Sequence, residues 1–184
     1  MSEEAMVRNC APTLAGIKTG NLFSYRYESI DQMRESVRFW NRRLRQKGVR
    51  VLPLRYRDDQ ALIYLYRPAQ LADDLQNNDA RAILRYCGYL PESAKKCIAR
   101  LMQRLKESTD FPHEIGLFLG YPPEDVSGFI TNHACNYKCV GCWKVYGDEQ
   151  KCRCLFAKYK QCTRIYESCL ERGTDVVSMT VTKY

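Results

Sequence analysis

The chain has 184 residues, of which 45% are hydrophobic and 27% are charged, and its formal net charge is +8. This composition is ordinary for a globular protein, so it excludes a wholly disordered chain, a collagen and a coiled-coil rod. The excess positive charge suits an anionic partner. The length predicts one domain, residues 1–184, that buries a core without disulfides or metals. Residues 1–9 are expected to form a flexible N-terminus.

The first predicted helix follows a loop or short strand at residues 10–18. Ser29 and Gln32 have the spacing of a capping box at its start. Apolar residues then recur every three or four positions as far as Leu44, which predicts a helix with one buried stripe. Gly48 is expected to end it.

A β-hairpin is predicted next, because Val49–Tyr56 and Ala61–Tyr66 are rich in β-branched and aromatic residues and flank a polar turn. Pro53 indicates that the first of these strands lies at an edge or is interrupted. Short helices should follow, each bounded by Pro or Gly. They are expected at about 68–75, 79–87, 91–105 and 123–132.

Three further strands are expected, at residues 114–119, 143–146 and 177–181. A long helix should lie between the last two, beginning after Asp148 and ending at Gly173. Helices and strands are thus interspersed along the chain. The predicted fold class is α+β (mixed α/β), a single domain with a mixed sheet of about five strands, packed helices and an early β-hairpin.

The chain carries ten cysteines, several times the usual frequency. Its first residues are acidic and show no signal-peptide pattern, and no apolar run approaches the about 20 residues that cross a bilayer. These features predict a cytoplasmic protein without a membrane partner. Thiols should be reduced there, which favours a metal-binding or redox role over a disulfide framework.

The sharpest pattern is the spacing of Cys135, Cys139 and Cys142. The spacing formally matches the cluster loop of radical-SAM enzymes. Two features argue against that enzyme class: Gly141 stands where an aromatic residue is usual, and only 42 residues follow Cys142. The Cys139–Cys142 pair is also a CxxC motif, whose thiols converge if these residues form a turn, as Gly141 permits. Such a turn makes a thiolate chelate or a redox dithiol. A strand, not a helix, is predicted to follow, which argues against a thioredoxin-like site.

A tetrahedral metal site needs two more ligands. Cys10 and Cys162 are the preferred ones, the second because it lies on the predicted buried face of the long helix. Cys135, His133 and His113 are weaker candidates. With only two histidines in the chain, zinc or an iron–sulfur cluster is the favoured cofactor. The simpler alternative is that buried cysteines only fill the core.

Two other groups of residues could carry function. His113 and Glu114 are adjacent and form a weak catalytic candidate as an acid/base pair; the alternative is a structural histidine. Four arginines share one face of the first predicted helix and could contact an anion or nucleic acid, although a solvated helix face is the simpler explanation for them. They are Arg34, Arg38, Arg42 and Arg45.

Several blocks resemble a bacterial family, common in anaerobes, that is known only as a domain of unknown function. The blocks are residues 10–18 (CAPTLAGIK), 48–54 (GVRVLPL), 61–68 (ALIYLYRP), 111–126 (FPHEIGLFLGYPPEDV) and 137–148 (YKCVGCWKVYGD). The resemblance implies a single-domain protein and supplies no activity. Its blocks include Cys10, His113, Glu114, Cys139 and Cys142.

Three functional hypotheses remain open. The first is a cytosolic protein that binds a metal or iron–sulfur centre, or acts as a redox dithiol, through the CxxC turn. The second is a non-catalytic binding or regulatory module whose basic helix meets nucleic acid or an acidic protein. The third is an enzyme that uses a cysteine, or His113 with Glu114, on a small substrate.

Overall fold

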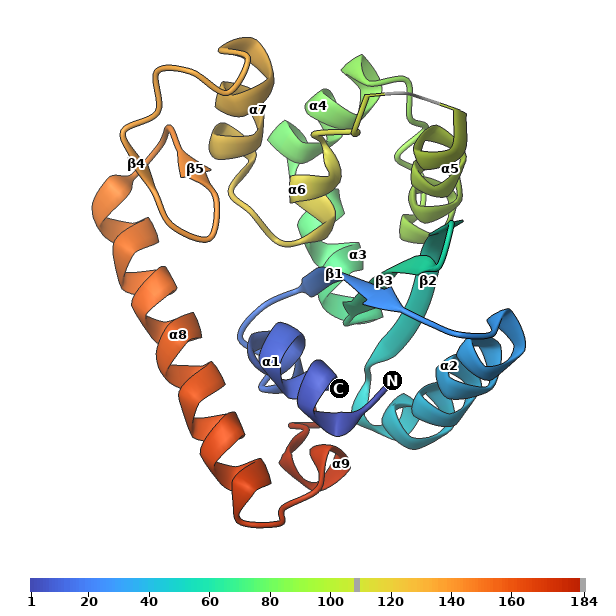
Figure 1. Cartoon of the computed structure of the whole chain (residues 1–184). Coiled ribbons are helices and arrows are strands. Elements are labelled where there is room, and N and C mark those ends of the chain that lie inside the picture. The colour runs from blue at the N-terminus through green and yellow to red at the C-terminus, as the bar shows by residue number, and fades with distance from the viewer. Residues whose placement is uncertain (108–109, 183–184) are drawn as a thin grey trace. The chain divides into compact units, whose positions relative to one another are not determined.

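The computed structural model describes residues 1–107 and 110–182. The chain packs as two compact units: the first unit is Met1–Ala69 with Tyr159–Tyr184, and the second unit is Gln70–Lys158. Helices and antiparallel strands are interspersed along the sequence, so the fold is mixed α/β with an early hairpin, as predicted (Figure 1). The long helix α8 (Glu149–Glu171) runs from the second unit into the first.

The first unit is built on a three-stranded antiparallel sheet. Its strands are β1 (Gly20–Arg26), β2 (Arg50–Arg57) and β3 (Gln60–Tyr66), in the order β1-β3-β2. The predicted hairpin is therefore confirmed, and β2 is an edge strand, as Pro53 indicates. A shift of register between Pro53 and Arg55 marks a bulge in this strand.

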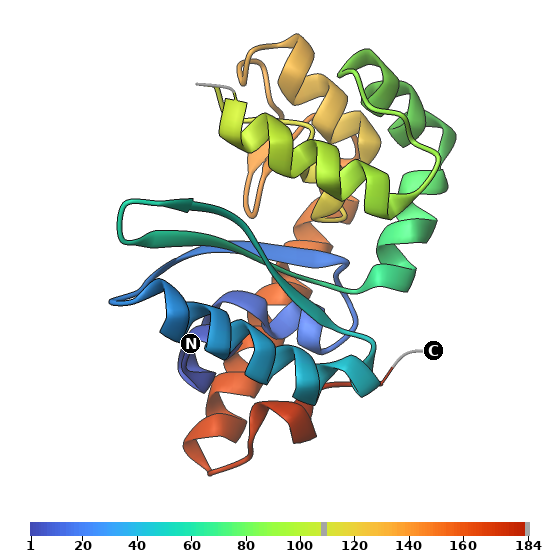
Figure 2. The same ribbon diagram turned by 90° about the vertical axis from the view of Figure 1, so that its right-hand side faces the viewer.

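Helices α1 (Glu3–Leu14) and α2 (Ile30–Leu44) cover one face of this sheet (Figure 2). Met33, Trp40 and Leu44 of the predicted stripe are buried, whereas Ile30 at its start is exposed. Ser29 caps the helix by accepting a hydrogen bond from the Asp31 amide. A short 3-10 helix, η1 (Arg45–Lys47), ends at Gly48 with a positive φ of 73°. The core joins both helices to the sheet through buried residues that include Met6, Leu14, Phe23, Met33, Trp40, Leu44, Ile63 and Leu65.

Helix α1 replaces the flexible segment and the loop or strand expected at residues 1–18. Its N-cap is Ser2, and Met6, Val7 and Cys10 are completely buried. Pro12 lies near the end of the helix, in a position that suggests a break when the sequence is read alone. Burial of the apolar residues spaced three and four apart outweighs the lost hydrogen bond of the proline.

The second unit is mostly helical. It contains α3 (Pro68–Gln76, from Gln70 onwards), α4 (Asn78–Tyr86), α5 (Ala94–Glu107), α6 (Ile115–Phe118), α7 (Pro123–Thr131) and the first part of α8. A small hairpin, β4 (Cys139–Val140) and β5 (Lys144–Val145), precedes α8. The strands of the described chain thus form one sheet of three and one of two.

Two of the expected strands are short helices. Residues 114–119 contain α6, and residues 177–181 overlap α9 (Val176–Met179), which is capped by Asp175. Both were predicted from short apolar runs, whose periodicity does not separate a strand from a helical turn. No helix in the described ranges is long and apolar enough to cross a membrane.

Candidate functional site

The two cysteines of the CxxC motif lie in the β4–β5 hairpin. Cys139 pairs with Val145 in the ladder, and the bend begins only at Gly141, whose amide donates a 3.0 Å hydrogen bond to the Trp143 carbonyl. The bend therefore starts two residues later than the expected turn at Cys139–Cys142. Cys139 is buried and Cys142 is exposed. The motif thus presents one thiol to the interior and one to solvent.

A buried carboxylate, Asp125 of α7, anchors this hairpin. Its Oδ1 accepts 2.7 Å hydrogen bonds from the backbone amides of Tyr146 and Gly147. Its Oδ2 accepts a 2.7 Å hydrogen bond from the indole Nε1 of Trp143. Charge-assisted bonds of this kind are stronger than neutral ones. Sequence reasoning missed Asp125; the available signal was an acidic residue directly beside the apolar position Val126.

The thiol of Cys152, on α8, is a further donor to the same carboxylate, at 3.4 Å from Oδ2. Burial raises the pKa of Cys152 to about 12, and the negative charges of Asp125 and of a Cys139 thiolate add to the shift. Since only a thiolate is nucleophilic, Cys152 is inert at neutral pH. Its role is to complete the set of donors around Asp125.

Aromatic rings hold the hairpin from the side. Trp143 stacks on Tyr121 with ring centroids 4.4 Å apart and meets Phe156 edge-on at 4.5 Å. A Cβ added to Gly141 would lie 2.1 Å from Cδ2 of Phe156, so only glycine fits against this ring. The backbone beside Cys142 is therefore fixed by packing as well as by Asp125.

The expected metal ligands do not form a ready site. Cys10 lies in the core of the first unit, where burial raises the pKa of its thiol, and Cys162 is half-buried on the part of α8 that belongs to the same unit. Cys135 and His133 are exposed in the segment between α7 and β4. Within the two described ranges, no group of three or more His, Cys, Asp or Glu side chains is arranged to hold a metal ion.

His113 and Glu114 have different environments in the structure. Glu114 is buried, accepts a 2.7 Å hydrogen bond from the Tyr89 hydroxyl and forms a 2.8 Å ion pair with Nε of Arg104. His113 is exposed, and its ring centroid lies 4.8 Å from that of Phe129. Burial, followed by the charge of Glu114, raises the pKa of Tyr89. The geometry fits a structural role for Glu114 inside the second unit.

The four arginines predicted to share a helix face are all exposed, on α2 and at the start of η1. Arg34 lies 3.4 Å from Asp31. Among the described residues, Arg38, Arg42 and Arg45 have no carboxylate within ion-pair distance. The outer face of α2 is therefore positively charged.

Most of the net charge belongs to the first unit. This unit holds 17 of the 29 Lys and Arg residues but only 10 of the 21 Asp and Glu residues. Between Ser36 and Arg57 there are eight basic residues and no acidic one. The sequence alone shows this uneven distribution of charge only in part, because Tyr159–Tyr184 is distant along the chain from Met1–Ala69, the rest of the first unit.

Comparison with known proteins gives a family but no activity. Searches of curated proteins and of solved structures find no match. A family model described as a protein of unknown function, DUF3793, matches residues 6–180. The match runs through both compact units, so they belong to one family domain. The chain is therefore a member of the DUF3793 family.

Proposed function

We propose that this protein is a binding module whose first unit takes a polyanionic partner on the outer face of α2. The observation that carries the proposal is the row of exposed arginines, of which Arg38, Arg42 and Arg45 have no carboxylate within ion-pair distance among the described residues. The excess of 17 basic over 10 acidic residues in this unit supports it. A row of like charges repels itself, and an anionic partner relieves that repulsion.

The helix supplies the spacing. Arg38 and Arg42 are four residues apart, which is a rise of about 6 Å along α2, and Arg45 follows at the start of η1. The three arginines can therefore meet successive charged groups of an extended polymer. The inner residues Met33, Trp40 and Leu44 are buried, which fixes the helix against the sheet before the partner arrives. Arginine pairs with phosphate through two parallel hydrogen bonds, so a nucleic-acid backbone suits this face best.

Binding of a nucleic acid should depend steeply on salt, because each neutralised phosphate releases counterions. We would measure binding of a labelled single-stranded RNA, a DNA duplex and polyglutamate over a range of salt concentrations. The triple variant Arg38→Gln/Arg42→Gln/Arg45→Gln should bind the nucleic acid at least about tenfold more weakly. Its slope of log K against log salt should be lower by about two to three.

A matched control removes three exposed charges from the second unit, with Lys95→Gln/Lys106→Gln/Lys151→Gln. This control should bind nearly as the wild type does. An equal loss of affinity in both variants would show that binding depends only on the net charge of the protein, and it would overturn the assignment to α2. Binding of polyglutamate but of neither nucleic acid would instead identify an acidic protein as the partner, and no salt-sensitive binding at all would sink the proposal.

Two-thiol chemistry at the β4–β5 hairpin is a second candidate function. It is supported by an exposed Cys142 on a packed turn, three residues from a buried Cys139. With a disulfide as substrate, the Cys142 thiolate would attack one sulfur and release one thiol. The Cys139 thiolate would then attack the Cys142 sulfur, release the second thiol and leave a Cys139–Cys142 disulfide. The protein loses two electrons and two protons, and the substrate gains them.

One protein preparation can test both this disulfide exchange and the binding of zinc or an iron–sulfur cluster by Cys139 and Cys142. Protein purified without oxygen would be assayed for zinc, iron and sulfide, and then for thiol release from a small disulfide. Cys142→Ser should abolish exchange, whereas Cys154→Ser, which removes an exposed thiol on α8, should not. Near-stoichiometric metal that is lost in Cys139→Ser/Cys142→Ser would identify a metal site; neither metal nor exchange would remove this candidate.

A further inference from the structure

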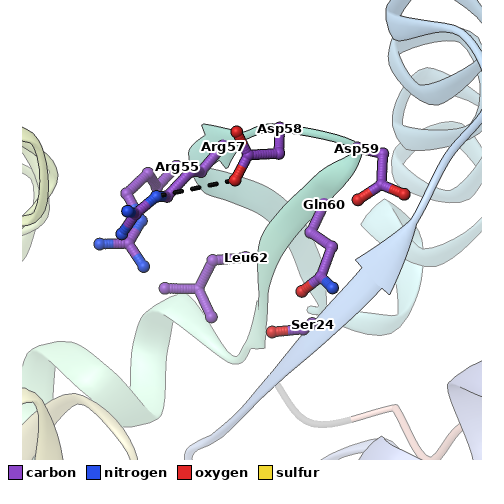
Figure 3. A pocket seen from close by; sticks show the side chains of 7 residues that line it. All are labelled: Ser24, Arg55, Arg57, Asp58, Asp59, Gln60 and Leu62. Carbon is purple, nitrogen blue, oxygen red and sulfur yellow. Dashed lines mark ion pairs between the residues drawn. The ribbon is translucent and has the colours of Figure 1, made fainter.

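A polar pocket of about 170 Å³ lies at the end of the three-stranded sheet, beside the β2–β3 turn (Figure 3). Leu62 lines it together with polar side chains of all three strands, Ser24, Arg55, Arg57 and Gln60. The turn residues Asp58 and Asp59 complete its lining. Every lining residue belongs to the first unit.

The register of the sheet explains how these side chains meet. Leu62 pairs with Ser24 on one side and Arg55 on the other, and Gln60 pairs with Arg57. Residues paired across strands, or two apart along one strand, lie on the same face of a sheet. The opposite face, which includes Phe23, Ala61 and Ile63, packs into the core of the unit.

The bulge in β2 places the arginines on the pocket face. Val51 lies on the core face, so without a shift of register the odd-numbered Arg55 and Arg57 would lie there too. The irregularity between Pro53 and Arg55 moves them to the other face and brings Tyr56 to the core side. A bulge that redirects side chains toward a pocket is a frequent device beside binding sites.

Neither carboxylate of the pocket holds Arg57 in a close ion pair. Asp59 is held by an ion pair with Arg26. Asp58 lies 3.8 Å from Nε of Arg57, beyond hydrogen-bond distance, and the two side chains are 86% and 77% exposed. An ion pair so exposed contributes little and is easily replaced. In Figure 3 the carboxylate of Asp59 lies on the far side of Gln60 from the arginines.

We propose that this pocket binds a phosphate group, with Arg57 as its principal cation and with the Ser24 hydroxyl and the Gln60 side-chain amide as hydrogen-bond donors. A guanidinium matches two phosphate oxygens at once. The volume suits a phosphate group and is below the about 300–1,000 Å³ of pockets that enclose drug-sized ligands. This site is distinct from the outer face of α2, and it goes beyond the proposed function because it takes a small anion.

The test is a nuclear magnetic resonance titration with inorganic phosphate at constant ionic strength, following the Arg57 Nε–H and Gln60 side-chain amide signals. We expect saturable shifts that sodium chloride does not produce. Arg57→Gln should weaken phosphate binding at least tenfold, while Arg85→Gln, an exposed charge in the second unit, should leave it unchanged. Asp58→Asn should tighten it, because a like charge at the rim is removed.

A parallel titration with phenyl phosphate distinguishes the two sources of the group. Equal or tighter binding of the ester would make the pocket a subsite for a larger phosphorylated ligand, and preference for the free ion would make it a phosphate site. The triple α2 variant should retain phosphate binding, so the two proposals can fail separately. Absence of saturable shifts with both anions, or an unchanged affinity in Arg57→Gln, would overturn the inference.

Discussion

The indole Nε1 of Trp143 donates a 2.7 Å hydrogen bond to the buried carboxylate of Asp125. Trp143 directly follows the exposed Cys142, and Asp125 also binds two backbone amides further along the hairpin. One carboxylate on α7 therefore fixes the arm of the hairpin that follows the exposed cysteine. The local structure of the hairpin depends on this anchor and on aromatic packing.

Replacing Asp125 should destabilise the protein strongly. Asp125→Asn puts an NH2 group where the carboxylate accepted bonds, so buried donors lose their partner. We expect a loss of about 3 kcal/mol in the free energy of unfolding, measured with urea and circular dichroism. The control Asp148→Asn removes an exposed carboxylate that caps the Lys151 amide and should cost about 1 kcal/mol or less. Similar losses in both variants would contradict the anchoring role.

Gly141→Ala should also be destabilising, because its Cβ would lie 2.1 Å from the Phe156 ring. Overpacking of this kind costs about 1–3 kcal/mol. Gly147→Ala is the matched control: its Cβ meets Cγ of the exposed Glu124 side chain, which can move away. The cost of Gly141→Ala should shrink in a Phe156→Leu background. An undiminished cost there would show that the ring is not the obstacle.

Substitutions at the adjacent residues His113 and Glu114 should differ sharply in their effect on the free energy of unfolding. Glu114→Gln breaks a buried ion pair with Arg104 and should cost about 3–5 kcal/mol. His113→Ala changes an exposed side chain and should stay within about 0.5 kcal/mol of the wild type. The measurement is urea unfolding of both variants at neutral pH. A large loss for His113→Ala would show that the two residues act together after all.

Stability should fall at alkaline pH in part through Cys152. Its pKa is raised in the folded state from about 9 to about 12, so between these values the unfolded chain binds fewer protons than the folded one. The stabilising contribution is therefore full below about pH 9 and is lost as the pH rises toward 12. Cys152→Ser keeps a donor for Asp125 and does not titrate there. Its free energy of unfolding should decline less than that of the wild type between pH 8 and 10.

Exposed and buried thiols of the folded protein should differ in their rate of alkylation. Iodoacetamide at pH 8 should modify the exposed Cys135, Cys142 and Cys154 and spare Cys152 in the folded state. Mass spectrometry of peptides after a short reaction identifies the modified thiols. Rapid modification of Cys152 would show that it is neither buried nor protonated as described.

The elements predicted correctly from sequence are those with a long local pattern. The stripe of α2 repeats over four turns, and the two strands of the β2–β3 hairpin flank a short polar turn. Helix α8 begins directly after Asp148 and ends at Glu171, two residues before Gly173. These signals come from residues close along the chain, because side-chain periodicity and capping are local properties. The exposure of Arg38, Arg42 and Arg45 followed from the same helical periodicity.

What the tertiary structure decided was the environment of single side chains. Helix α1 forms across Pro12 because its apolar side meets the sheet, and α6 and α9 replace expected strands. Cys139 and Cys142 differ in exposure although they are three residues apart. Asp125 anchors the hairpin because the tertiary structure packs α7 against it. Local sequence determined the charge and the elements with a long periodic pattern. Burial and hydrogen-bond partners depend on residues distant along the chain, so only the tertiary structure decided them.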